Sequence, residues 1–199
     1  MSSVLLAPLC ALLYLAASGR QLWSISQGDQ RIGASALTLG LTAMALHAYL
    51  AWNIVVSEQG ISLGFFKISA VIFLFINVAC VASLARRPLQ NLLVVLFPLA
   101  ALSVLISSFA PETGGTQPSM SAGLLLHVGS SILAYAVLTL AAAQSAVLWL
   151  QDSQLRQHNT GGIVRILPPL QLMESMLFEL LWVGVSLLTV AIVSGFVFV

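Results

Sequence analysis

The sequence predicts an all-α protein, a polytopic transmembrane helix bundle of about six spans, and two observations support this prediction. Hydrophobic residues make up 59% of the 199 residues and charged residues only 7%, whereas soluble domains carry roughly 25% charged residues. The hydrophobic residues also gather in six stretches separated by polar and turn-forming residues. Because unpaired backbone groups are not tolerated in lipid, such stretches are expected to be helices that cross a lipid bilayer.

The six apolar stretches differ in length, and a span needs about 20 residues. They cover residues 3–18, 32–56, 64–84, 91–109, 121–150 and 180–199. The first stretch is short, but it lacks the basic start and the cleavage site of a signal peptide, so we expect a retained helix. The fifth stretch is long enough to tilt or to protrude from the membrane.

No linker or second domain interrupts these stretches, so residues 1–199 are expected to form one integral membrane domain. Before the sixth stretch, residues 166–179 contain Pro168 and Pro169, followed by apolar residues at helical spacing. This segment fits either an interfacial amphipathic segment or the inner end of the sixth helix. The chain ends in SGFVFV, inside an apolar stretch, so truncation at the C-terminus is an expectation from the sequence.

The distribution of basic residues predicts that the N-terminus lies outside. Loops after the first, third and fifth stretches hold six of the seven Lys and Arg residues, namely Arg20, Arg31, Arg86, Arg87, Arg156 and Arg165. Loops after the second and fourth stretches hold Glu58 and Glu112 and no basic residue. Cytoplasmic loops carry the excess of Lys and Arg, so the first group of loops is expected inside. With a net charge of +1 and no basic run, the chain shows no sign of a nucleic-acid partner.

Two histidines, His47 and His127, lie inside the second and fifth stretches. An ionisable side chain at bilayer depth is costly and is read as functional by default. The predicted topology places both imidazoles at one level, about 9–14 Å below the outer boundary, on neighbouring helices that run in opposite directions. They could therefore face each other as two axial ligands of one haem iron. Small residues beside them, such as Gly40 and Gly123, would leave room for a macrocycle, although they would equally let helices pack closely.

Further polar groups in the apolar stretches have a functional and a plain structural interpretation. Lys67, the only lysine, is either a counter-charge for a haem propionate or a lysine that reaches back to the interface. Asn53, Asn77 and Gln144 are expected to form hydrogen bonds between helices. The two cysteines form no C-x-x-C pair, which argues against covalent c-type haem attachment. Hydrolytic motifs are also missing, so we expect a protein that is not an enzyme.

The segments HVGSSILAYAVLTLAAAQSAVLWLQDSQLR and LPPLQLMESMLFELLWVGVSLLTVAIVSG are similar to the membrane cytochrome c assembly family (CcsA/CcmC-like), in its YpjD/HemX-like branch. The resemblance extends over residues 40–195. It implies a multi-pass protein of the bacterial inner membrane that is related to haem-handling factors and binds haem b, with His47 and His127 as iron ligands. The tryptophan-rich WWD loop of the better-known members is missing, and relatives in this branch usually continue for further helices.

Three functions remain open at this point. The first is a haem-b-binding membrane protein of cytochrome c assembly or haem handling, with other membrane proteins of that process as partners. The second is a non-enzymatic scaffold or regulatory subunit that has kept the fold and lost the haem. The third is a transporter of protons or small molecules that uses the two histidines.

Overall fold

The computed structural model confirms an all-α membrane protein. It describes residues 3–27, 32–57, 60–62, 64–84, 90–111, 116–117, 121–158, 161 and 167–198. In these residues the long helices are α1 (Ser3–Ser26), α2 (Ala34–Val55), α3 (Phe65–Ser83), α4 (Gln90–Phe109), α5 (Ala122–Arg156) and α7 (Leu170–Phe198). All six are long and apolar enough to cross a membrane, in agreement with the six predicted spans.

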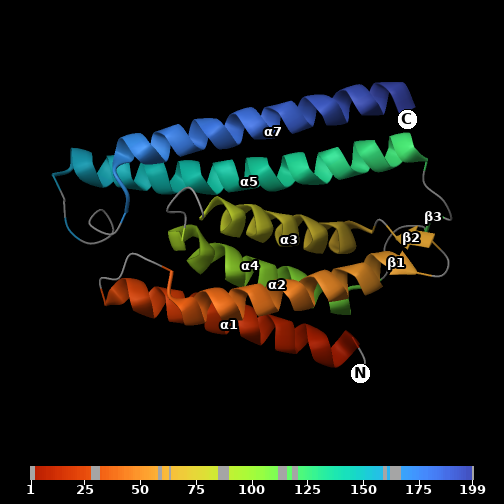
Figure 1. Cartoon of the computed structure of the whole chain (residues 1–199), viewed down its shortest axis with the longest axis horizontal. Coiled ribbons are helices and arrows are strands. Elements are labelled where there is room, and N and C mark those ends of the chain that lie inside the picture. Colours follow the sequence, from red (N-terminus) through yellow and green to blue (C-terminus); the bar gives the residue numbers. More distant parts are fainter. Residues whose placement is uncertain are drawn as a thin grey trace.

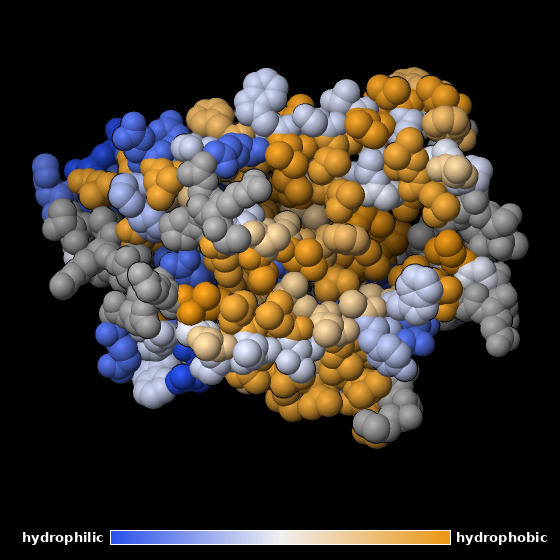
Figure 2. Space-filling model, in the orientation of Figure 1, coloured by the Kyte–Doolittle hydropathy of each residue, from blue (hydrophilic) through white to orange (hydrophobic). Residues whose placement is uncertain are grey.

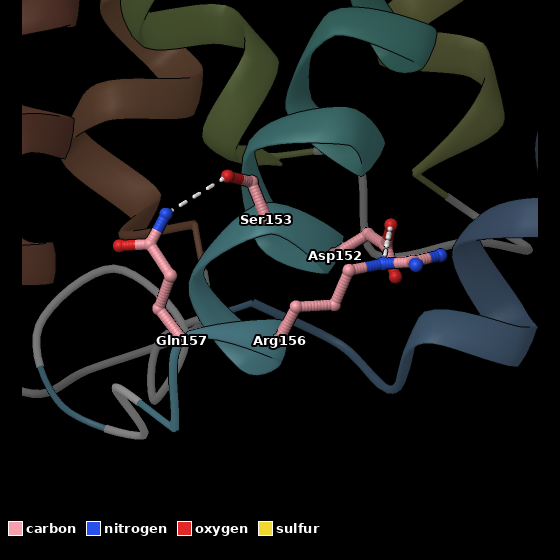
Figure 3. Close-up of polar contacts among 4 residues, drawn as sticks. All are labelled: Asp152, Ser153, Arg156 and Gln157. Carbon is pink, nitrogen blue, oxygen red and sulfur yellow. Dashed lines mark hydrogen bonds and ion pairs between the residues drawn. The ribbon is translucent and has the colours of Figure 1, made fainter.

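Three helices, α1, α5 and α7, extend by several residues beyond the apolar stretches that predicted them. Helix α1 continues from the predicted end at residue 18 to Ser26, and α5 continues from residue 150 to Arg156. In the added turns of α5, Arg156 pairs with Asp152 at 2.8 Å, one helical turn away (Figure 3). Charged and amide side chains end an apolar stretch without ending a helix, because they are good helix formers outside lipid.

Most of the segment before the sixth stretch belongs to α7. Helix α7 begins at Leu170 and runs without a break to Phe198, so residues 170–179 form its first turns. Residues 170–179 are thus continuous with the sixth span, whereas residue 166 lies outside the described residues and an interfacial position of this segment stays a prediction. Pro168 and Pro169 directly precede this helix, where proline is best tolerated because the first helical N–H groups have no partner inside the helix.

A small antiparallel sheet, which the sequence did not predict, closes one end of the bundle. Its strands are β1 (Val56–Ser57), β2 (Gly60–Ser62) and β3 (Thr116–Gln117), in the order β1-β2-β3. Val56 pairs with Ile61, and Ile61 pairs with Gln117. The sheet therefore joins the connection between α2 and α3 to the connection between α4 and α5 (Figure 1).

The helices form two groups that meet at α3. Helix α1 packs against α2 and α4, and α3 packs against α2 and α4, whereas α7 packs against α5 (Figure 1). Helix α3 also packs against α5 and so joins the pair α5–α7 to the other four helices. The largest fully buried side chains lie mostly in the four-helix group and include Tyr14, Phe97, Leu50, Ile76 and Leu93.

The outer surface of the bundle is mainly apolar, as contact with a lipid bilayer requires. Apolar side chains cover the middle of the molecule, and hydrophilic ones gather mainly at the end opposite the sheet (Figure 2). Exposed apolar side chains are numerous on α7, where Phe196 is 90% exposed and Trp182 is 73% exposed. A surface this apolar is stable in lipid and not in water, so the molecule is an integral membrane protein.

The intramembrane amides mostly bond within their own helices. Asn53 donates to the carbonyl of Tyr49 at 2.7 Å, and Asn77 donates to the carbonyl of Phe73 at 2.8 Å. Gln144 alone of the three crosses to another element, donating to the carbonyl of Met173 at 3.3 Å. The expectation of hydrogen bonds between helices was therefore right for Gln144 and wrong for the two asparagines.

Candidate functional site

His47 lies in the packed interior of the four-helix group. Its side chain is 1% exposed, and its Nδ1 is 3.1 Å from the Tyr14 hydroxyl of α1. The two rings meet edge to face, with centroids 5.8 Å apart and planes at 88°. The other ring nitrogen, Nε2, is buried without a hydrogen-bond partner. The backbone of Ala70 in α3 is close to the ring, but it does not reach hydrogen-bonding geometry with Nε2.

The surroundings of His47 are filled by side chains. Tyr14 packs against Phe97 of α4 with ring centroids 5.4 Å apart, and both side chains are fully buried. A Cβ atom added to Gly40 would lie only 2.6 Å from Cζ of Phe97. The volume that Gly40 leaves free is therefore occupied by the Phe97 ring, and close packing of helices explains this glycine.

His127 lies near the start of α5 and faces α7. The hydroxyl of Ser121 accepts a hydrogen bond from the backbone N–H of Leu124 at 3.2 Å, which caps α5 and fixes its first turn. Nδ1 of His127 is 2.8 Å from the carbonyl oxygen of Ala191. A carbonyl only accepts, so Nδ1 carries the proton, and Nε2 of a neutral ring keeps its lone pair.

The glycines around His127 also serve the packing of α5 against α7. A Cβ on Gly195 would lie 3.0 Å from Cε1 of His127, and a Cβ on Gly123 would overlap the ring of Phe198. Gly195 thus makes room for the imidazole itself, and Gly123 makes room for the Phe198 ring. Both positions let the two helices approach closely, as small residues do in membranes.

The structure places the two histidines at a similar level but in different helix pairs. His47 lies eight residues before Val55, the last residue of α2, and His127 lies five residues after Ala122, the first of α5. At 1.5 Å per residue they are about 12 Å and about 8 Å from the helix ends beside the sheet. The expectation that α2 and α5 are packed neighbours is wrong, because α3 packs against both and lies between them.

Lys67 lies at the same end of the bundle, in the first turn of α3. Its Nζ donates to the hydroxyl of Ser62 in β2 at 3.0 Å. The ammonium group thus reaches toward the sheet and the interface, as expected for a lysine near a helix end in lipid. A role as a counter-charge for a propionate stays a prediction.

The donor atoms fit haem iron, whereas the space beside the glycines does not hold a macrocycle. His127 has the arrangement typical of a metal-ligating histidine, since one ring nitrogen is held by a backbone carbonyl and the other keeps its lone pair. His47 has a buried ring nitrogen without a partner. Yet the positions of Gly40 and Gly123, which were expected to leave a flat space, face Phe97 and Phe198.

Tyr14, Ala191 and Gly195 were not recognised from the sequence as neighbours of the histidines. A tyrosine in an apolar helix has a hydroxyl that needs a partner, so Tyr14 carried a signal that could have been used. The roles of Ala191 and Gly195 depend on a backbone carbonyl and on a close approach of two helices, neither of which leaves a mark in the sequence of α5.

Comparison with known proteins places the chain in a family. The profile of the family "Cytochrome C assembly protein" matches residues 34–199. The chain is 26% identical to the inner membrane protein YpjD of Escherichia coli (strain K12) over 138 residues, which are 69% of this chain and 52% of that protein. It is 30% identical to an uncharacterised 28.8 kDa protein of Azospirillum brasilense over 129 residues, 64% of this chain and 47% of that protein.

The chain thus spans about half the length of the curated relatives it matches. No solved structure matches the chain. The family profile covers most of the sequence, including α2, α3, α4, α5 and α7 with both intramembrane histidines. This multi-pass membrane protein therefore belongs to the cytochrome c assembly protein family.

Proposed function

We propose that this protein binds haem b in the membrane, without catalysing a reaction, and that His127 and His47 are the ligands of its iron. The observation that carries the proposal is the hydrogen bond of 2.8 Å between Nδ1 of His127 and the carbonyl of Ala191. It holds the imidazole in one tautomer with the Nε2 lone pair available for a metal. Haem supplies an iron that accepts such lone pairs.

His47 supports the proposal as the second ligand. Burying a ring nitrogen without a partner costs about 1–3 kcal/mol, and Nε2 of His47 has none. A metal bond would satisfy this atom. Because α3 lies between the two helices, ligation of one iron by both imidazoles requires a packing in which the pair α5–α7 moves relative to α2.

The spectrum of the purified protein tests this proposal. We expect haem-replete cells to yield a protein with a Soret band and, if both imidazoles bind one iron, a six-coordinate low-spin spectrum. His127→Ala should remove the pigment, and His47→Ala should remove it or convert it to a five-coordinate high-spin form. His158→Ala is the matched control, because His158 lies outside the helices, in the turn just after α5, where its own backbone φ is 56°. A folded wild-type protein without pigment would refute haem binding.

We further propose that the protein resides in the bacterial inner membrane and works with other membrane proteins of haem handling or cytochrome maturation. The name of the Escherichia coli relative, an inner membrane protein, supports this location. In this proposal Lys67 pairs with a haem propionate near the sheet. Lys67→Gln is then expected to weaken haem retention without changing the ligand spectrum, whereas unchanged retention would leave Lys67 as an interfacial lysine.

A non-enzymatic scaffold that has lost haem is the second candidate. It is favoured by the packing of Phe97 against Gly40 and of Phe198 against Gly123, which fills the space expected for a macrocycle. In this case His127 would serve only to hold α7 against α5. A folded, colourless protein whose haem titration changes no absorbance would support the scaffold.

A further inference from the structure

A small cavity lies between α4, α5 and the start of α7, in the half of the bundle away from the sheet. Its volume is about 10 Å³, counted as the space that the centre of a water molecule can occupy. The side chains around it include Asn91, Leu92, Gln144, Val147, Pro168 and Met173. A site that holds one water needs roughly 10–15 Å³ by this measure and two to four polar partners.

Two amide oxygens at this cavity are buried without a hydrogen-bond partner. They are Oδ1 of Asn91 in α4 and Oε1 of Gln144 in α5. The Gln144 side chain is fully buried, and its Nε2 is already engaged with the carbonyl of Met173. Leaving a buried acceptor unsatisfied costs about 1–3 kcal/mol. Two such acceptors at one cavity therefore call for a ligand that donates two hydrogen bonds.

We propose that one water molecule binds in this cavity and bridges Asn91 and Gln144. Water donates two hydrogen bonds, one to each amide oxygen, and its size matches the cavity. The hydrogen bond from Nε2 of Gln144 to the carbonyl of Met173 fixes the orientation of that amide, so its Oε1 accepts from the water. If the Asn91 amide is turned so that its nitrogen faces the cavity, the water accepts from Asn91 instead. A bound Ca²⁺ would need six to eight oxygen ligands and Mg²⁺ about six, far more than these two amides supply.

The position of the water gives it a structural role. Asn91 belongs to the four-helix group, and Gln144 belongs to the pair α5–α7, which otherwise joins that group mainly through α3. The water thus forms a second, polar link between the two groups. Because Gln144 also donates to the carbonyl of Met173, this link reaches the start of α7 through Gln144.

Magnetisation transfer from water, measured by solid-state NMR on the full chain in lipid bilayers, tests this site. We expect the Gln144 side-chain amide to receive magnetisation several times faster than the backbone amide of Leu140, which lies one turn away and is also fully buried. Equal rates for Gln144 and Leu140 in the wild-type protein would overturn the proposal, and this comparison requires no variant.

Substitutions then test the bridge itself. Asn91→Leu removes one of the two partners and should lower the transfer to Gln144 to the rate of Leu140. Asn77→Leu is the matched control, because Asn77 is a fully buried amide whose Oδ1 also has no partner but which does not line the cavity. We expect this control to leave the transfer to Gln144 unchanged. Fast transfer that persists in a folded Asn91→Leu protein would refute the bridge.

Discussion

Replacing Gly40 by alanine should destabilise the four-helix group, and the structure indicates by how much. The new Cβ would lie 2.6 Å from Cζ and 3.0 Å from Cε2 of Phe97, whereas carbon atoms in contact prefer about 3.5–4.0 Å. The Phe97 ring cannot swing into open space, because it is fully buried and packs against Tyr14. The ring or the helix must therefore shift by about 1 Å, and overpacking of this kind costs about 1–3 kcal/mol.

Gly129→Ala is the matched control for this substitution. A Cβ at Gly129, inside α5, would meet no atom within 4 Å. Both variants gain the same helix propensity of about 1 kcal/mol, so the difference between them isolates the clash. We expect Gly40→Ala to be less stable than Gly129→Ala by about 1–3 kcal/mol in reversible unfolding in mixed micelles. Equal stability of the two variants would show that Phe97 does not fill the space beside Gly40.

Three further predictions concern the histidines and the topology. Tyr14→Phe should destabilise the protein by about 1–3 kcal/mol, since it leaves Nδ1 of His47 without a hydrogen-bond partner in addition to Nε2. Adding His47→Leu to this variant should restore part of the lost stability. A Tyr14→Phe variant as stable as the wild-type protein would contradict the prediction. Gly195→Ala should displace the imidazole of His127 and change the NMR chemical shifts of that ring, because the new Cβ would lie 3.0 Å from Cε1 of His127. Unchanged shifts would argue against this contact. A cysteine at Pro111 should react with an impermeant maleimide in intact cells and one at Ser26 only after lysis; the reverse pattern would place the N-terminus inside.

The six spans could be predicted because lipid imposes a simple requirement on length and composition. The small sheet could not be predicted in the same way. Its strands contain only two or three residues each, and β3 pairs with β2 although α3 and α4 separate these two strands in the sequence. Pairing between such distant short segments depends on where the helices bring their ends, which local sequence does not encode.

For the histidines, the level in the bundle could be predicted from the sequence, whereas the neighbouring side chains could not. Their depth followed from the apolar stretches, and the structure agrees on a similar level for His47 and His127. Their neighbours did not follow, because the position of α3 between α2 and α5 results from packing along whole helices. Glycine beside a histidine fits both a ligand space and a close helix contact, and only the positions of Phe97 and Phe198 distinguish these readings here.

The contact between α5 and α7 also fixes when the environment of His127 is completed during synthesis. Its hydrogen-bond acceptor, Ala191, belongs to the 29-residue helix α7, which packs against α5. A nascent chain that has inserted its first five long helices therefore still carries an imidazole N–H without this acceptor. The pairing of His127 therefore cannot form before α7 is in place, and insertion of α7 determines whether it occurs.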